Sequence, residues 1–256
     1  MADITPRRPR LPTSKKPLDS SGGTNMSLPP RVSLDDVLEK YETKNTSRII
    51  GLSDATGSMS GLWSKTQKHL TEMIARIARL GECELRWVAY RDYGDGNGLL
   101  ESSGWEKAPE PLLRFIQSIH CHGGQDWEEA VEKALEFAAN DDRATRVLLI
   151  GDAPPHAERD YRQQAKRLGQ LERPVFSFVV GGSPETFRVF SEISQLSGGT
   201  CCHLEDVDDL IDVVVITAAH DMGGEDLVLE YTRKYAKQLS SSGKSYSSKL
   251  LMLKGG

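Results

Sequence analysis

Oxygen-bearing side chains gather at two points of the sequence, each directly after a short apolar segment. Asp54, Thr56 and Ser58 alternate with small residues after the first segment, and Asp152 follows the second. Carboxylate and hydroxyl oxygens are the ligands that Mg²⁺ prefers, and an alternating loop directs several of them to one point. The spacing therefore favours a divalent-cation site, although the same residue types are also common helix caps.

A third polar stretch, His122-Gly-Gly-Gln125-Asp126, precedes a predicted helix. The carbonyl oxygen of Gln125 is a metal ligand in principle, either directly or through a water, and Asp126 is the alternative ligand beside it. Asp92 lies on a turn after another predicted strand, where it either reaches the same metal face or is solvated. Glu128 and Glu129 are expected to open the following helix, where acidic side chains complement the helix dipole.

From residue 47 onward, short apolar runs alternate with apolar residues at helical spacing. This alternation is typical of βαβ units, and continuous apolar strands require a sheet that helices cover on both faces. We therefore predict an α/β fold with a doubly wound, mostly parallel central sheet flanked by helices. The expected strands are 48–53, 83–90, 99–105, 147–150, 175–180 and 200–204, and the expected helices are 70–81, 112–116, 127–138, 161–168, 187–196 and 207–219. Strands 83–90 and 99–105 should form a hairpin.

In such a sheet, ligands bind beyond the carboxyl ends of the strands. Both Asp54 and Asp152 follow predicted strands, so they should lie at that edge.

The order and spacing of these motifs resemble the von Willebrand factor type A (vWA) domain over roughly residues 47–220. In that family, a D-x-S-x-S loop, a Thr in a later loop and an Asp after the next parallel strand form the metal-ion-dependent adhesion site. Asp54, Thr56 and Ser58 match the first motif, with Thr in place of the first Ser. Asp152 matches the last motif, and Gln125 stands nearest to the position of the family's Thr.

Three phrases are most similar to the intracellular branch of the family, which includes vWA domains beside alpha-kinases and stand-alone microbial proteins. They are Tyr90-Arg-Asp-Tyr93, Gly123-Gly-Gln-Asp-Trp-Glu-Glu-Ala-Val131 and Leu149-Ile-Gly-Asp-Ala-Pro-Pro-His156.

The resemblance implies that Mg²⁺ or Mn²⁺ is held by Asp54, Thr56, Ser58, Gln125 and Asp152. Asp126 and Asp92 stay candidate supporting acids on the grounds of their positions alone. The resemblance also implies an open coordination position that binds an Asp or Glu carboxylate of a protein partner. Such a module recognises a partner and is not an enzyme.

The sequence divides into three parts. Residues 1–46 are predicted to be a mostly disordered basic arm rich in Pro and Ser, residues 47–222 the vWA-like domain, and residues 223–256 a helical extension. Helices are expected around Val228–Leu239 and Leu250–Leu253, on either side of a Ser-rich break at 240–242. Their apolar faces either dock on the domain itself or serve a partner or self-assembly.

The net charge of −5 is unevenly distributed along the 256 residues. Residues 1–31 hold six basic and two acidic side chains, so the rest of the chain carries a charge of −9. An acidic body repels a phosphate backbone, so nucleic-acid binding is unlikely for the folded part and stays open only for the arm.

No apolar stretch approaches the ~20 residues of a membrane span. Four cysteines, two of them adjacent, suit a reducing compartment better than a disulfide framework, so we expect a cytoplasmic protein.

Several other sequence patterns are weaker indications of a functional site. The groups His120-Cys121-His122, Cys201-Cys202-His203 and His156 lack zinc-site spacing and are interpreted as ordinary loop and strand-end residues. Ser242-Gly-Lys-Ser245 lacks the first glycine of a phosphate-binding loop.

Two rival functions remain. An assembly subunit would use the arm and the terminal helices without a metal. A metal-dependent hydrolase would need a general base, for which His156 and Asp126 are the candidates.

Overall fold

The computed structural model describes residues 47–65, 73, 76–77, 82–124, 127–181, 183–205 and 207–252. All of them belong to one compact unit, Val32–Gly256. The predicted arm, residues 1–46, and most of the predicted helix 70–81 lie outside the described residues. Within that helix, Met73 and Ile77 are described; both are helical and buried in the core.

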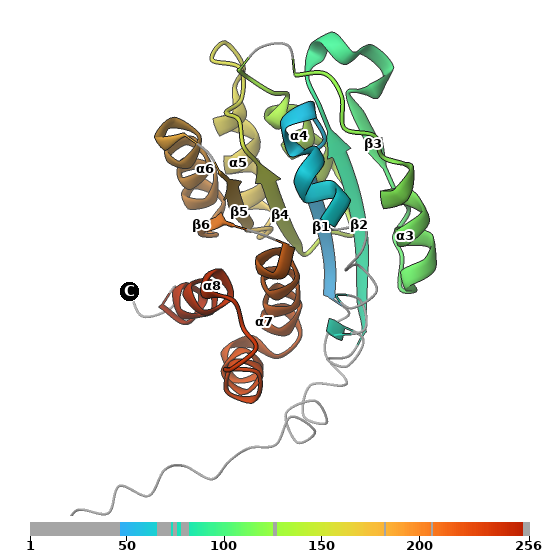
Figure 1. Ribbon diagram of the computed structural model, residues 1–256. Helices are drawn as coiled ribbons and strands as arrows, with labels where there is room; N and C mark the ends of the chain where they lie inside the picture. Colours follow the sequence, from blue (N-terminus) through green and yellow to red (C-terminus); the bar gives the residue numbers. More distant parts are fainter. Residues whose placement is uncertain are drawn as a thin grey trace, which may run out of the picture. The chain divides into compact units, whose positions relative to one another are not determined.

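The described residues form a sheet of six strands in the order β3-β2-β1-β4-β5-β6, which Figure 1 shows across the middle of the molecule. All neighbouring strands are parallel except β2 and β3, which form the predicted antiparallel pair. The strands are β1 (Ser47–Asp54), β2 (Cys83–Tyr90), β3 (Leu100–Ser102), β4 (Arg146–Gly151), β5 (Val175–Val180) and β6 (Cys201–Leu204). The predicted doubly wound, mostly parallel sheet is confirmed.

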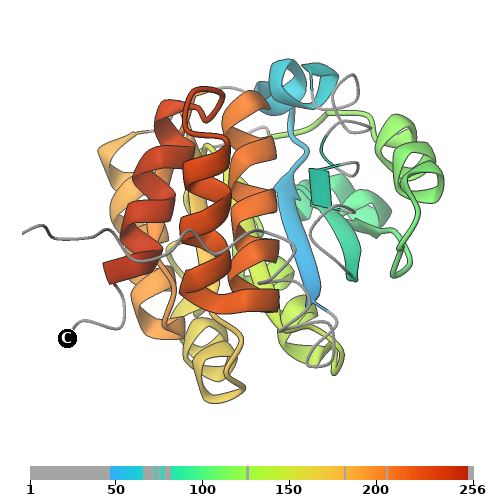
Figure 2. The same cartoon turned by 90° about the horizontal axis from the view of Figure 1, so that it is seen from below.

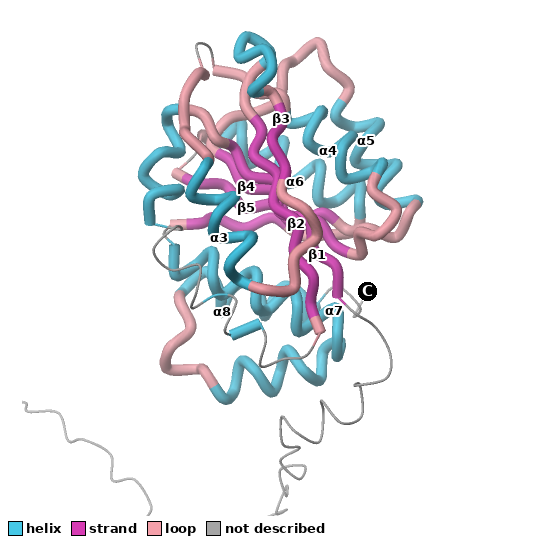
Figure 3. Tube along the Cα trace, turned by 90° about the vertical axis from the view of Figure 1, so that its right-hand side faces the viewer, coloured by secondary structure: helices cyan, strands magenta, loops and turns pink. Residues whose placement is uncertain are grey.

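Helices cover both faces of this sheet, as Figure 3 shows from the side. The helical segments are η1 (Gly57–Met59), η2 (Tyr93–Gly98), α3 (Pro109–Ser118), α4 (Val131–Asn140), α5 (Tyr161–Gln170), α6 (Pro184–Ser197), α7 (Val207–Lys234) and α8 (Ser241–Met252). The core side chains of α4, α5 and α6 belong to one buried cluster, and those of α3, α7 and α8 belong to the other.

The central strands are apolar on both sides because each side meets a helix layer. In β4, Leu148 and Ile150 join the cluster under α7 and α8, whereas Val147 and Leu149 join the cluster under α4, α5 and α6. This alternation follows from the two-residue period of a strand. The continuous apolar runs in the sequence are therefore the signature of a sheet covered on two faces.

The C-terminal helices lie side by side on one face of the sheet, as Figure 2 shows for the orange-to-red segments α7 and α8. Tyr246 of α8 is fully buried, and its ring meets the rings of Phe176 and Phe178 edge to face at 5.7 and 5.2 Å. The Tyr246 and Thr217 hydroxyl groups share a buried hydrogen bond of 2.7 Å. The extension therefore docks on its own domain, the first of the two alternatives left open by the sequence.

Four predicted element bounds were wrong. Helix α7 continues past residue 219 to Lys234, with a bend at Gly224, and the serines 241 and 242 begin α8 and do not separate two helices. Strand β3 ends at Ser102, before Trp105. Helix α4 begins at Val131 and not at residue 127, because the backbone of Glu129 pairs with the loop after β4.

The strand order reverses direction at β1, because β2 lies on one side of it and β4 on the other. A crevice forms at such a switch point, beyond the carboxyl ends of the two strands. Asp54 is the last residue of β1, and Asp152 follows the last residue of β4. The topology thus places both carboxylates at the position where parallel sheets of this type bind ligands.

Candidate metal centre

Asp54 is fully buried at the end of β1 and fixes the loop that follows it. Its Oδ1 atom accepts hydrogen bonds from both the backbone N–H and the hydroxyl of Thr56, each at 2.7 Å. The hydroxyl oxygens of Thr56 and Ser58 are 3.2 Å apart. Because Thr56 donates its proton to Asp54, the hydroxyl oxygen keeps a lone pair that is available to a ligand.

Neighbouring elements hold this loop in place. The indole Nε1 of Trp63 donates to the Asp54 carbonyl at 2.6 Å, and the amide of Ala55 donates to the Tyr90 carbonyl at 2.8 Å. Met59 inserts into the core directly after the hydroxyl-bearing residues. The loop is therefore anchored to the sheet on both sides of Thr56.

Asp152 reaches the same edge because Gly151 allows close packing beneath it. A Cβ atom on Gly151 would lie 2.5 Å from the Tyr90 hydroxyl and 3.4 Å from the Asp54 Cβ. Tyr90 is buried between these residues and donates to the Ile150 carbonyl at 3.2 Å. Only a residue without a side chain fits between the ends of β1, β2 and β4 at this point.

Two carboxylate oxygens are buried at this edge without a donor. Among the described residues, neither Oδ2 of Asp54 nor Oδ1 of Asp152 has a hydrogen-bond partner. A buried carboxylate oxygen without a partner is costly, and a bound cation is one way to remove that cost. Four oxygen-bearing side chains, Asp54, Thr56, Ser58 and Asp152, thus fit the ligand preferences of Mg²⁺ or Mn²⁺.

The electrostatic environment of Asp54 also favours a bound cation. The pKa of Asp54 is raised from 3.8 to about 7, mainly because the carboxylate is buried and in smaller part because of the negative charge of Asp152. The two hydrogen bonds from Thr56 oppose this rise. A divalent cation beside Asp54 would replace the proton that this buried carboxylate retains.

The His122-Gly123-Gly124 turn packs against the loop that begins at Asp54. The amide of His122 donates to the Ala55 carbonyl at 3.1 Å, and Gly123 and Gly124 both have positive φ angles, 78° and 72°. A Cβ atom on Gly124 would lie 3.1 Å from the Thr56 Cβ, so the turn packs directly on the Asp54 loop. Gln125 and Asp126 follow this turn but lie outside the described residues.

Asp92, the other predicted supporting acid, has contacts of a different kind. Its Oδ1 atom accepts from the amide of Tyr93 and lies 2.6 Å from Nε2 of His156. No hydrogen bond or ion pair joins it to Asp54 or Asp152 among the residues that the structure describes.

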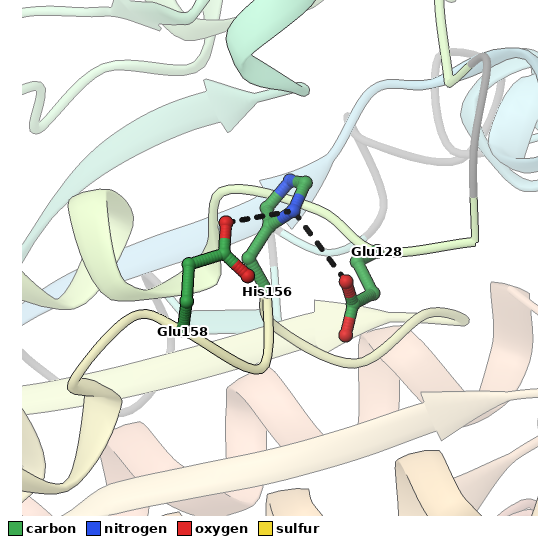
Figure 4. Close-up of side chains that lie close together, drawn as sticks. All are labelled: Glu128, His156 and Glu158. Atoms are coloured by element: carbon green, nitrogen blue, oxygen red, sulfur yellow. Dashed lines mark ion pairs between the residues drawn. The ribbon is translucent and has the colours of Figure 1, made fainter.

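The same imidazole takes part in a cluster that the sequence did not reveal. Nδ1 of His156 lies 3.6 Å from a Glu128 carboxylate oxygen and 3.9 Å from one of Glu158. Figure 4 shows the three side chains pointing toward one another from two loops. Glu128 had been interpreted as a helix-opening acid, which was wrong because α4 begins at Val131. In the sequence, the Pro-Pro-His156 phrase was the one hint of this cluster, and it does not have the residue spacing of a known metal site.

Trp127 is a second feature that sequence reasoning missed. Its side chain is 55% exposed, although the periodicity placed it on the buried face of a helix. It lies in the loop between Gly124 and α4, so the chain exposes a large aromatic ring in this segment.

Comparison with known structures identifies the architecture. A von Willebrand factor type A protein from Catenulispora acidiphila is 16% identical, with a TM-score of 0.51 over 70% of this chain and 43% of that chain. The hypothetical protein BatB from Bacteroides thetaiotaomicron is 12% identical, with a TM-score of 0.51 over 69% of this chain and 98% of that chain. The pilus adhesin SpaC from Lactobacillus rhamnosus GG, in its open conformation, is 10% identical, with a TM-score of 0.53 over 73% and 30% of the two chains.

These similarities show that the chain has the vWA fold, as the motifs predicted. No family model matches the sequence. A putative ariadne-like RING finger protein of Acanthamoeba polyphaga mimivirus is 32% identical over 119 residues, which are 44% of this chain. The chain spans only 12% of that relative and 43% of the Catenulispora protein. Among the described helices, none is long and apolar enough to cross a membrane.

Proposed function

We propose that this domain is a protein-interaction module that binds a partner carboxylate through a divalent cation. The observation that carries the proposal is the pair of buried oxygens, Oδ2 of Asp54 and Oδ1 of Asp152, that have no donor among the described residues. They lie with the hydroxyls of Thr56 and Ser58 at the switch point of the sheet, which supports a ligand site there.

Asp54, Thr56, Ser58 and Asp152 would hold Mg²⁺ or Mn²⁺, with Gln125 as the ligand supplied by the third loop. The ion supplies a positive charge and a coordination position that an Asp or Glu side chain of the partner fills. The protein's own residues orient the oxygens. Thr56 is held by Asp54, and Asp54 is held by Trp63 through its backbone.

Binding of a protein partner fits this site better than catalysis of a hydrolytic reaction. A hydrolase would need a general base beside the ion, and His156 is the candidate among the described residues. Its imidazole hydrogen-bonds with Asp92 and faces Glu128 and Glu158, so its contacts among the described residues are with acids outside the Asp54 site. Exposed Trp127 supports an interaction role, because aromatic anchors are enriched in protein interfaces.

The test is affinity capture with the full chain in Mg²⁺, in parallel with Asp54→Ala and with Asp142→Ala. Asp142 is an exposed aspartate in the turn between α4 and β4, so its variant is the matched control. We expect partners that bind the wild type and the control, and that are lost in Asp54→Ala and on addition of a chelator.

A captured partner should then lose affinity when one of its own carboxylates is changed to the amide. Identical partners for all three chains, with and without chelator, would place the interaction surface elsewhere and overturn the proposal.

A further inference from the structure

A second cluster of metal-ligating side chains lies outside the Asp54 site, on the loops before α4 and after β4. It consists of Glu128, His156 and Glu158, whose ligand atoms all lie within 4.8 Å of one another. His156 and Glu128 are partly buried, with side chains 12% and 34% exposed, whereas Glu158 is 68% exposed.

Asp92 determines which nitrogen of His156 faces the two glutamates. An ionised carboxylate only accepts hydrogen bonds, so Nε2 at 2.6 Å from Asp92 carries the proton. Nδ1, on the other side of the ring, faces the carboxylate oxygens of Glu128 and Glu158 at 3.6 and 3.9 Å. A positive charge among these groups, either a bound cation or a second proton on the imidazole, offsets the repulsion between the two carboxylates.

The spacing suits a transition-metal ion. Zn²⁺ bonds of about 2.0–2.2 Å at tetrahedral angles place neighbouring ligand atoms roughly 3.3 Å apart, a few tenths of an ångström less than the two separations here. Imidazole nitrogen favours Zn²⁺ over Mg²⁺, which prefers oxygen ligands. A histidine that donates its other N–H to a carboxylate is the usual support of a metal-binding imidazole.

The two loops that carry the cluster are joined by their backbones. The Glu129 amide donates to the Pro154 carbonyl at 2.9 Å, and the Ala157 amide donates to a Glu128 carboxylate oxygen at 3.0 Å. Tyr93 packs edge to face on the His156 ring at 5.5 Å. Glu128 and His156 are therefore held in position, and only the exposed Glu158, which also lies 4.0 Å from Arg159, has to move.

We infer that Glu128, His156 and Glu158 form a second metal site that takes Zn²⁺ with three protein ligands and an open fourth position, distinct from the Mg²⁺ site of Asp54. This inference does not depend on the proposed function, because none of its ligands belongs to the Asp54 site. Asp92 is its positioning residue, since it acts on the ion only through His156.

The experiment is calorimetric titration of the full chain with Zn²⁺ in excess Mg²⁺. We expect one Zn²⁺ per chain in the wild type, at least about tenfold weaker binding in Glu158→Gln and loss of binding in His156→Ala. Asp92→Asn should weaken Zn²⁺ binding about 10–100-fold, as expected when the support of a metal-binding histidine is removed. Glu158 is exposed, so its substitution cannot act by unfolding the chain.

Two control variants separate this site from other zinc ligands. Cys121→Ser removes the half-buried thiol, and Glu185→Gln alters an exposed glutamate on α6. Both should bind Zn²⁺ like the wild type. In the NMR spectrum, Zn²⁺ should shift the Nδ1 signal of His156.

The inference is overturned if the wild type does not bind Zn²⁺, or if His156→Ala binds it as tightly as the wild type. It is also overturned if Zn²⁺ leaves the Nδ1 signal of His156 unshifted and the ring is an imidazolium paired with its three acids.

Discussion

Thr56 donates two hydrogen bonds to a single carboxylate oxygen, Oδ1 of Asp54, one from its backbone and one from its hydroxyl, both at 2.7 Å. This arrangement satisfies one side of a fully buried carboxylate and leaves Oδ2 without a donor among the described residues. The proposed cation site can therefore be tested through the stability of the chain with and without the ion.

Substitution of Asp54 by Asn should separate folding from metal binding. The amide oxygen of Asn keeps the acceptor for both Thr56 donors but removes the charge that a divalent cation needs. At Mg²⁺ concentrations 100 times the dissociation constant, the wild type should gain about 2.7 kcal/mol, equivalent to several degrees in Tm. Thermal melts with and without Mg²⁺ should show this gain in the wild type and in Asp142→Asn, and none in Asp54→Asn. An equal gain in Asp54→Asn would exclude the Asp54 site.

The raised pKa of Asp54 makes the stability of the metal-free protein depend on pH. The pKa of Asp54 is about 7 in the folded chain, against the ordinary value of 3.8 that applies to the unfolded chain. The folded chain therefore binds the proton more tightly. The stabilisation from this group is fully present below about pH 4 and is lost as the pH rises to about 7. The slope is at most about 1.4 kcal/mol per pH unit.

Denaturant melts of the metal-free wild type and of Asp54→Asn across this pH range measure the effect. The difference in unfolding free energy between the two proteins should grow in favour of Asp54→Asn as the pH rises. Mg²⁺ affinity of the wild type should increase over the same range, because the ion competes with the proton. A difference that stays constant with pH would show that Asp54 does not retain a proton in the folded chain.

Gly151 should tolerate no side chain, because Tyr90 occupies the space beside it. A methyl group there would lie 2.5 Å from the Tyr90 hydroxyl, and such overpacking typically costs about 1–3 kcal/mol. Gly151→Ala should therefore lower stability and weaken Mg²⁺ binding, and Tyr90→Phe in the same chain should partly restore both. Gly61→Ala is the control, since its added methyl group would meet no described residue within 4 Å beyond its own helix backbone and chain neighbours. If Tyr90→Phe brings no recovery, the packing explanation fails.

Trp127 should contribute strongly to partner binding and little to stability. Its side chain is 55% exposed beside the third loop, and truncated interface hot spots typically cost about 2 kcal/mol or more, roughly 30-fold in affinity. Trp127→Ala should lose this affinity with an unchanged Tm. Leu171→Ala, at the C-terminal end of α5, alters another exposed apolar residue and should leave affinity unchanged. Equal affinity of Trp127→Ala and the wild type would remove Trp127 from the interface.

Docking of α8 can be tested through one hydroxyl group. Tyr246→Phe removes the hydrogen bond with Thr217 but leaves the bond from Thr217 to the Val213 carbonyl at 2.7 Å. The expected loss is about 0.5–1.5 kcal/mol in the free energy of unfolding, with Mg²⁺ binding unchanged. Urea melts measure the loss. A change in Mg²⁺ affinity would instead couple the C-terminal helices to the metal site.

The fold was predictable because its signals are local. Apolar runs such as Val147–Ile150 and helical spacing around Tyr161–Leu168 are determined by the period of each element, and both were confirmed. Element ends were less predictable. Trp127 to Ala130 follow the helical period, but the backbone of Glu129 pairs with the loop after β4, so α4 starts later. That competing hydrogen bond comes from residues 25 positions away along the chain and leaves no trace in the local pattern.

The sequence by itself indicated the oxygen-bearing residues of the candidate site, their order, and the two strands that Asp54 ends and Asp152 follows. Strand alternation and loop spacing depend on neighbouring residues, so they can be recognised in one dimension. Only the tertiary structure decided that two carboxylate oxygens are buried without a donor from any described residue, that Asp92 contacts His156, and that His156 meets Glu128 and Glu158. These relationships join loops distant in sequence, and packing of the sheet and its helices alone sets the distances between them.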